Sequence, residues 1–136
     1  MNKVFQVSVV TYAGIAYQGE AECLTIENQD GELGILPEHC PYFTLLYPGK
    51  MVIKLRSRIE TWIYGDGFLQ FTGDNCVVLT EFAENIRDID PAKAAVMEKE
   101  VSEKLAAYRY KTEEEQSELR KAQKIARLEL KLAKSQ

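Results

Sequence analysis

The sequence predicts an α+β protein, in which an N-terminal antiparallel β domain is followed by a C-terminal pair of helices that is able to open. Short runs of alternating apolar and polar residues recur about every ten residues up to position 88, as in a β-sandwich or barrel. All eight glycines and all four prolines lie at or before Pro91. Beyond Pro91 the apolar residues recur at the three- and four-residue intervals of a helix face. We therefore place a β domain at residues 1–88 and a helical hairpin at 89–136.

Strands are predicted wherever apolar side chains alternate with polar ones, because one face of such a strand is buried and the other is exposed. The turns between them are marked by short polar sequences such as NQDG at 28–31 and GDN at 73–75. The alternating runs lie at residues 5–9, 23–27, 51–56, 59–64, 68–72 and 76–82. Many short strands with turns between them indicate an antiparallel sandwich or barrel.

The segment Gly31–Lys50 breaks this pattern, although it is largely apolar. It holds Pro37, Pro41 and Pro48, each of which removes a backbone donor, so it is not expected to form a regular central strand. It also holds His39, the only histidine of the chain. We interpret the segment as a rigid loop that passes between strands.

Two helices are predicted after residue 88. The first begins at Pro91 with Asp90 as its N-cap, and the second begins after Thr112, which forms a capping-box pattern with Glu115. The expected buried stripe of the first helix is Ala94, Met97, Val101, Leu105 and Tyr108. The expected buried stripe of the second helix is Leu119, Ala122, Ala126, Leu130 and Ala133. The junction YRYKT at 108–112 has no Gly, Asn or Pro, so the helices form either a folded hairpin, the expected resting form, or one long rod.

Charge is distributed unevenly along the chain. Residues 1–88 carry six Lys and Arg against twelve Asp and Glu, whereas residues 89–136 carry eleven against nine. The positive charge gathers on the second helix, which suits an acidic protein surface or a phosphate. The basic residues of this helix are Arg120, Lys121, Lys124, Arg127, Lys131 and Lys134. Because the whole chain is acidic and has no basic stripe interleaved with aromatic residues, no nucleic acid is expected as a partner.

No motif of catalysis, metal binding or membrane insertion is evident. Cys23, Cys40 and Cys76 are widely spaced, unlike a disulfide framework or a zinc site, so we expect reduced thiols in a cytosolic setting. The chain lacks a Walker loop, a GxSxG motif and any apolar run of the ~20 residues that span a bilayer. A catalytic pair of His39 and Cys40 is not expected, because adjacent residues of an extended loop point apart. We therefore expect no active site, no metal, no cofactor and no direct membrane insertion.

Four stretches of the chain resemble the epsilon subunits of bacterial F-type ATP synthases. They are DGELGILPEHCP at 30–41, YPGKMVI at 47–53, GDGFLQF at 65–71 and DIDPAKA at 88–94. The similarity covers nearly the whole chain, and its most specific part is the motif from Gly31 to Pro41. It implies a sandwich of two stacked sheets at the foot of the central stalk. A subunit of this kind turns with the rotor and couples a proton- or sodium-driven ring to ATP synthesis.

The resemblance also implies partners for individual residues. Thr11 and Glu32 correspond to positions near the loops of the membrane-embedded c-ring, and His39 to a position near the gamma subunit. Ring loops commonly carry a basic residue, with which Glu32 would pair. In this family the helices can open and rise along gamma, where their basic residues meet an acidic segment of the beta subunit and restrain ATP hydrolysis. The resemblance further implies a peripheral position in the complex, on the cytoplasmic face of the bacterial cell membrane.

Some bacterial members of this family bind ATP where the sandwich meets the helices, through two acidic residues followed by two arginines. This chain keeps the acidic positions as Glu84 and Asp90, but Lys93 and Glu100 stand where the arginines are expected. A lysine does not replace a bidentate arginine, and a carboxylate repels a triphosphate. We expect weak ATP binding or none, so ATP release is not the expected switch between helix states.

The main alternative function is a freestanding β-sandwich module that binds a nucleotide or a sugar, with the helices as a dimerisation arm. Such a module would bind its ligand as an isolated chain, whereas a stalk subunit would do little alone and bind gamma tightly. An enzyme that uses His39 is a third hypothesis, and it would lose turnover in a His39→Ala variant.

Overall fold

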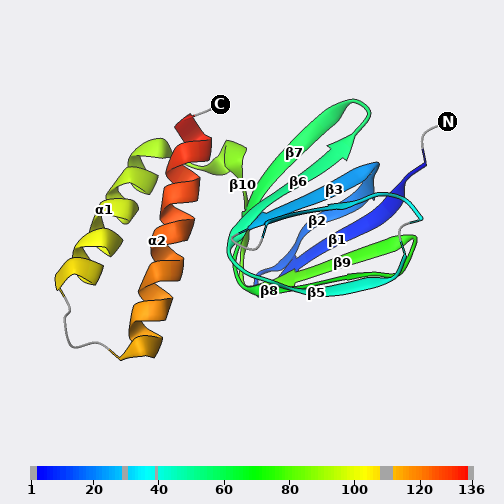
Figure 1. Ribbon diagram of the computed structural model, residues 1–136. Coiled ribbons are helices and arrows are strands. Elements are labelled where there is room, and N and C mark those ends of the chain that lie inside the picture. Colours follow the sequence, from blue (N-terminus) through cyan, green and yellow to red (C-terminus); the bar gives the residue numbers. More distant parts are fainter. Residues whose placement is uncertain (1–2, 29–30, 39, 108–111, 135–136) are drawn as a thin grey trace. The chain divides into compact units, whose positions relative to one another are not determined.

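The computed structural model of the chain describes residues 3–28, 31–38, 40–107 and 112–134. The chain divides into two compact units, Met1–Asn85 and Ile86–Gln136. The first unit is a sandwich of two five-stranded sheets, and the second is a pair of packed helices (Figure 1). The predicted fold class, a β-sandwich followed by a helical hairpin, is confirmed.

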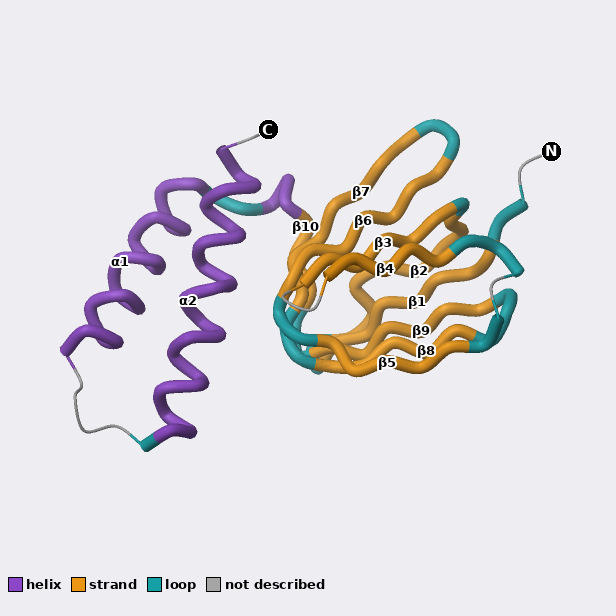
Figure 2. The backbone as a smooth tube through the Cα atoms, in the orientation of Figure 1, coloured by secondary structure: helices purple, strands orange, loops and turns teal. Residues whose placement is uncertain are grey.

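One sheet, which we call the first sheet, contains the N-terminal strand. Its strands in spatial order are β2 (Gly14–Ala21), β1 (Phe5–Thr11), β9 (Asn75–Thr80), β8 (Gly67–Phe71) and β5 (Tyr42–Leu46). Neighbouring strands of this sheet, which can be located in Figure 2, are antiparallel except for β1 and β9, which run parallel. The sandwich is therefore antiparallel with one parallel pair. This pair brings the first strand of the chain beside β9, which lies near the end of the sandwich sequence.

The second sheet is antiparallel throughout. Its strands in spatial order are β10 (Ala83–Asn85), β7 (Arg58–Tyr64), β6 (Gly49–Leu55), β3 (Cys23–Asn28) and β4 (Gly31–Ile35). Facing side chains of the two sheets form the core, and the predicted alternation places them there: Val7 and Val9 are buried, as are Leu24 and Ile26. The Phe5 and Phe71 rings meet edge to face, with centroids 5.3 Å apart.

The proline-rich segment Gly31–Lys50 is not a continuous loop, and this part of the sequence-based interpretation is wrong. It forms β4 and β5, which are edge strands of opposite sheets, and the chain crosses from one sheet to the other between them. Pro37 and Pro41 lie in this crossover, where their missing N–H groups break no strand pairing. Glu38 in the same crossover has a left-handed φ of 65°.

The three cysteines are reduced and differ in accessibility: Cys40 is exposed, Cys23 is half-buried and Cys76 is buried. Burial raises the pKa of the Cys76 thiol to about 12. Because the thiolate is the reactive form, we expect Ellman's reagent at pH 8 to modify Cys40 rapidly and Cys76 only after urea unfolds the sandwich. A Cys40→Ser variant identifies the fast site. Rapid modification of Cys76 in the folded chain would contradict the core position.

The second unit begins with a short 3-10 helix, η1 (Ile86–Asp88), followed by α1 (Pro91–Ala107) and α2 (Glu113–Lys134). Both predicted N-caps are confirmed. The Ala92 N–H donates to Asp90 Oδ1 at 2.9 Å, and the Glu115 N–H donates to Thr112 Oγ1 at 3.2 Å. Among the described residues, no helix is long and apolar enough to cross a bilayer.

The two helices pack as the expected hairpin, but the buried face of α1 differs from the predicted stripe. Ala94 and Val101 are buried, whereas Met97 is 52 % exposed. The face that meets α2 follows positions 94, 98, 101 and 102, and Met97 lies beside that line. Tyr108 lies outside the described residues. On α2, Ala126 and Ala133 are buried, since small side chains allow two helices to approach closely.

Candidate functional site

An apolar row crosses the outer face of the first sheet. In strand register, Leu45 of β5 lies opposite Phe68 of β8, Phe68 opposite Leu79 of β9, Leu79 opposite Val10 of β1, and Val10 opposite Ile15 of β2. The next residues inward, such as Leu46 and Val78, are buried, so the row points away from the core. These five residues, together with Phe43, form what we call the apolar row.

The apolar row is open to solvent at most of its positions. Ile15 is 62 % exposed, Leu45 is 60 % exposed and Phe43 is 59 % exposed. The rings of Phe43 and Phe68 contact each other, with centroids 5.5 Å apart. A sheet that buries one apolar face and exposes a second contiguous apolar surface is typical of a subunit that binds another protein.

A pocket of about 290 Å³ adjoins the row where β1, β8 and β9 end or begin. Its lining residues are Thr11, Tyr12, Asp66, Gly67, Phe68, Leu79, Thr80 and Glu81. The Thr80 hydroxyl donates to the Gly65 carbonyl at 3.0 Å, which ties down the turn that forms one wall. Tyr12 is 91 % exposed at the rim. The pocket lining thus combines apolar side chains with the carboxylates of Asp66 and Glu81.

Thr11 and Glu32, the residues expected near the c-ring, lie at the same end of the sandwich in different sheets. Thr11 ends β1, and the registers across β9 and β8 place this end at the same edge of the sheet as the end of β5. β5 leads through two residues to Gly49, which lies against the carbonyl of Glu27, the cross-strand partner of Glu32. The registers therefore place both predicted residues at this end.

The Thr11 and Glu32 side chains differ in whether their polar groups are already hydrogen-bonded within the chain. The Thr11 hydroxyl accepts from the Ala13 N–H at 3.1 Å and donates to the Gly14 carbonyl at 3.2 Å, so it shapes its own turn. Glu32 is exposed and has no hydrogen-bond or ion-pair partner among the described residues. The neighbouring Glu27 carboxylate pairs with the Lys50 ammonium at 3.2 Å. Glu32 is the more available of the two predicted contact residues.

His39, the residue expected near gamma, lies outside the described residues. The crossover around it is held to the opposite end of the sandwich from Thr11 and Glu32. The Glu38 N–H donates to the Gly73 carbonyl at 3.2 Å, and the Glu38 carboxylate pairs with the Lys3 ammonium at 2.9 Å. The assignment of His39 to a contact remains a prediction.

The residues of the degenerate nucleotide motif have ordinary structural positions. Glu84 is half-buried in β10, and Lys93 and Glu100 are exposed on α1. The Asp90 carboxylate accepts the Ala92 N–H as the helix cap. Within the described residues, no group of three or more His, Cys, Asp or Glu side chains is placed to hold a metal ion.

The basic side chains of α2 gather along one groove. It has a volume of about 290 Å³ and is lined by Arg120, Gln123, Lys124, Arg127, Leu128 and Lys131, which include four of the six predicted basic residues. Lys121 lies outside its lining, and the Lys134 side chain lies outside the described residues. The Lys124 ammonium is buried and has no hydrogen-bond partner among the described residues. We call this surface the basic groove.

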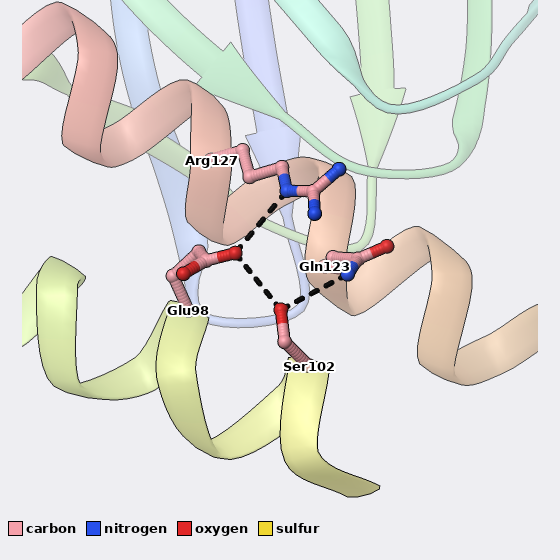
Figure 3. A network of polar contacts seen from close by, with 4 residues as sticks. All are labelled: Glu98, Ser102, Gln123 and Arg127. Carbon is pink, nitrogen blue, oxygen red and sulfur yellow. Dashed lines mark hydrogen bonds and ion pairs between the residues drawn. The ribbon is translucent and has the colours of Figure 1, made fainter. Parts of the chain in front are cut away.

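A network of four polar side chains joins the two helices (Figure 3). Arg127 Nε donates to Glu98 Oε1 at 3.2 Å, Ser102 Oγ donates to the same oxygen at 2.8 Å, and Gln123 Nε2 donates to Ser102 Oγ at 3.0 Å. These bonds, first that from Ser102 and then that from Arg127, lower the pKa of the Glu98 carboxyl below its usual range. Glu98 is therefore ionised at neutral pH.

Sequence reasoning identified Arg127 but not the other three members of this network. A signal was present: Glu98 and Ser102 are four residues apart, and so are Gln123 and Arg127, so each pair shares one face of its helix. Which faces meet depends on the packing of the helices, and the sequence does not contain that information directly.

Comparisons with known proteins identify relatives of both units. Residues 4–86 match the family model of the ATP synthase delta/epsilon chain β-sandwich domain. The ATP synthase epsilon chain of Acidithiobacillus ferridurans is 33 % identical over 128 residues, covering 94 % of this chain and 91 % of the relative. That of Anoxybacillus flavithermus is 34 % identical over 105 residues, covering 77 % and 78 %.

Two solved structures share the fold. A chain of the Euglena gracilis mitochondrial ATP synthase, in a structure of OSCP, F1 and the c-ring, has a TM-score of 0.79 at 20 % identity, covering 95 % of this chain and 81 % of its own. A chain of the Tetrahymena thermophila mitochondrial ATP synthase central stalk and c-ring has a TM-score of 0.62 at 11 % identity, covering 97 % and 98 %. At these identities the likeness establishes the fold alone.

Proposed function

Because the chain belongs to the delta/epsilon family of ATP synthase chains, we propose that it acts as an epsilon-type subunit of the central stalk. It is a regulatory, non-catalytic rotor subunit of an F-type ATP synthase. It turns with the stalk and couples ring rotation to ATP synthesis, and its helices restrain ATP hydrolysis. A freestanding sugar- or nucleotide-binding module is not favoured, since the matching relatives are ATP synthase epsilon chains.

The observation that carries this function is the apolar row. The sandwich already has a complete core between its sheets, so its stability does not require the exposed Phe43, Leu45 and Ile15 side chains. A row that spans all five strands of one sheet offers a flat, rigid docking surface. We assign the gamma subunit to this surface, and the row would be buried in the assembled stalk.

The end of the sandwich that carries Thr11 and Glu32 would face the loops of the c-ring. The exposed Glu32 carboxylate is suited to a basic ring residue, and Thr11 would act through the shape of its turn. His39, which lies outside the described residues, is proposed to contact gamma. One surface at this end and one across the first sheet would let the sandwich transmit torque without deforming, because the strand registers fix the spacing between the two surfaces.

The helical unit would act on the beta subunit. When the hairpin opens, the basic groove would meet an acidic segment of beta and restrain ATP hydrolysis. A single exposed ion pair is worth only ~0–1 kcal/mol, so docking would depend on the four basic residues together and would weaken with salt. Because Glu100 and Lys93 replace the expected arginines, ATP would not control this step.

Membership of an ATP synthase complex would hold the chain at a membrane without direct insertion into the bilayer. As part of an ATP synthase, the subunit is peripheral, and we propose the cytoplasmic face of the bacterial cell membrane as its location. Neither a metal nor a cofactor is required for the stalk role.

A truncation tests whether the sandwich binds the complex and the helices restrain ATP hydrolysis. ATP hydrolysis is measured in the catalytic complex reconstituted with the full chain and with a chain ending at Asp88. We expect hydrolysis to rise severalfold with the truncated chain, because the helices that restrain it are gone, while co-purification shows that both chains bind. If neither chain binds the complex, the stalk function is wrong. If both bind and hydrolysis is equal, the helices do not restrain this enzyme.

A further inference from the structure

Arg127 is part of the basic groove and also of the contact between the two helices. It lines the basic groove proposed to dock on an acidic partner, and it is also bonded to Glu98 of α1 in the packed hairpin. We propose that Glu98 forms an autoinhibitory contact, which opposes docking of the basic groove on its partner. The Glu98 carboxylate occupies Arg127 in place of a partner carboxylate, so hairpin closure and full docking of the basic groove compete for the Arg127 side chain. The competition rests on the proposed function of the helices, whereas the contact that closes the hairpin does not.

The geometry shows how the two contacts compete. A guanidinium binds a carboxylate most strongly through two parallel N–H groups, and its side-on edge consists of Nε and one terminal nitrogen. Glu98 Oε1 already accepts from Nε at 3.2 Å, so this edge is not available to a second carboxylate while the hairpin is closed (Figure 3). Only the end-on pair of terminal nitrogens remains.

The rest of the network holds Glu98 in this position. Ser102 donates to the same carboxylate oxygen at 2.8 Å, and Gln123 from α2 orients the Ser102 hydroxyl at 3.0 Å. Two residues of each helix therefore take part, and separation of the helices breaks the bonds of Gln123 and Arg127 together. An intramolecular carboxylate also has a high effective concentration, which a partner has to overcome.

Glu98 is the residue of α1 suited to this role. Glu100 and Glu103 are exposed on the same helix, and among the described residues neither forms a hydrogen bond or ion pair with α2. Glu103 therefore provides a matched control, since Glu103→Gln removes the same charge from the same helix without touching the network.

The first experiment follows the hairpin in the isolated full-length chain. Amide hydrogen exchange is measured by mass spectrometry over residues 91–107 and 113–134, because unpacked amphipathic helices are only marginally stable in water. We expect exchange in both helices to rise about two- to fivefold in Glu98→Gln, the range that a single ion-pair contact allows. Ser102→Ala should do the same without a change of charge, and Glu103→Gln should match the natural chain. Equal exchange in Glu98→Gln and Glu103→Gln would overturn the closing role of Glu98.

The second experiment measures ATP hydrolysis in the catalytic complex saturated with each full-length variant, beside the chain ending at Asp88. Glu98→Gln is expected to restrain hydrolysis more strongly than the natural chain and Glu103→Gln, because the hairpin opens more readily and Arg127 is released. If truncation raises hydrolysis while Glu98→Gln leaves it unchanged, the competition is refuted. If truncation has no effect, the proposed restraint fails, and hydrogen exchange alone decides whether Glu98 closes the hairpin.

Discussion

Replacement of Phe68 by aspartate is expected to weaken binding of the chain to the ATP synthase complex by about 100-fold or more. Phe68 lies in the apolar row between Leu45 and Leu79, and its ring contacts that of Phe43. A carboxylate at this position would be buried without a partner in the assembled stalk, which costs several kcal/mol. The affinity is measured by titrating labelled chain onto a complex that lacks this subunit.

A matched control separates docking from folding. Ile59 is 63 % exposed on β7 of the other sheet, so Ile59→Asp introduces the same charge away from the apolar row. Both variants should melt close to the temperature of the natural chain, because both side chains point away from the core. If Phe68→Asp binds as tightly as Ile59→Asp, the apolar row is not the docking surface. The surface that binds gamma would then lie elsewhere on the sandwich.

Replacement of Gly67 by alanine is expected to destabilise the sandwich by about 3 kcal/mol. A Cβ at Gly67 would lie 1.8 Å from the Leu79 carbonyl oxygen and 2.7 Å from the Thr80 Cα. Both are backbone atoms of β9, the central strand of the first sheet, so relief requires β8 and β9 to move apart. Urea unfolding measures the loss, with the fluorescence of Trp62, the only tryptophan, as the signal.

Gly34 provides the control for this substitution. A Cβ at Gly34 meets nothing within 4 Å, and its φ lies outside the left-handed region, so Gly34→Ala should change stability by less than about 0.5 kcal/mol. Equal unfolding midpoints for Gly67→Ala and Gly34→Ala would show that β8 and β9 tolerate the extra methyl group. The close approach of the two strands at Gly67 would then not restrict this position to glycine.

Much of the local structure was predictable because its causes are local. The alternation of Val7 and Val9 with polar neighbours identified buried strands, and Asp90 and Thr112 identified helix starts through hydrogen bonds that span two or three residues. The motif from Gly31 to Pro41 identified the family. The basic residues of α2 were visible as composition, since four of them follow one helical face.

The sequence-based predictions were wrong or silent where the local structure depends on contacts with distant parts of the chain. The segment Gly31–Lys50 supplies two edge strands because each finds a partner on one side only, and prolines are tolerated between them. The parallel pairing of β1 with β9 joins residues about seventy positions apart and leaves no local signature. Met97 is exposed because the packing of α2 selects a face of α1 beside the one that periodicity suggested.

The sequence by itself determined the two-part architecture, the helix caps, the charge of α2 and the family, because each depends on residue types at short spacing. Tertiary structure alone decided the surfaces. The apolar row takes single residues from five strands, and only sheet order brings Ile15 and Leu45 onto one face. In the same way, Glu98 and Arg127 are 29 residues apart, and they become one contact only because two helices pack in one register.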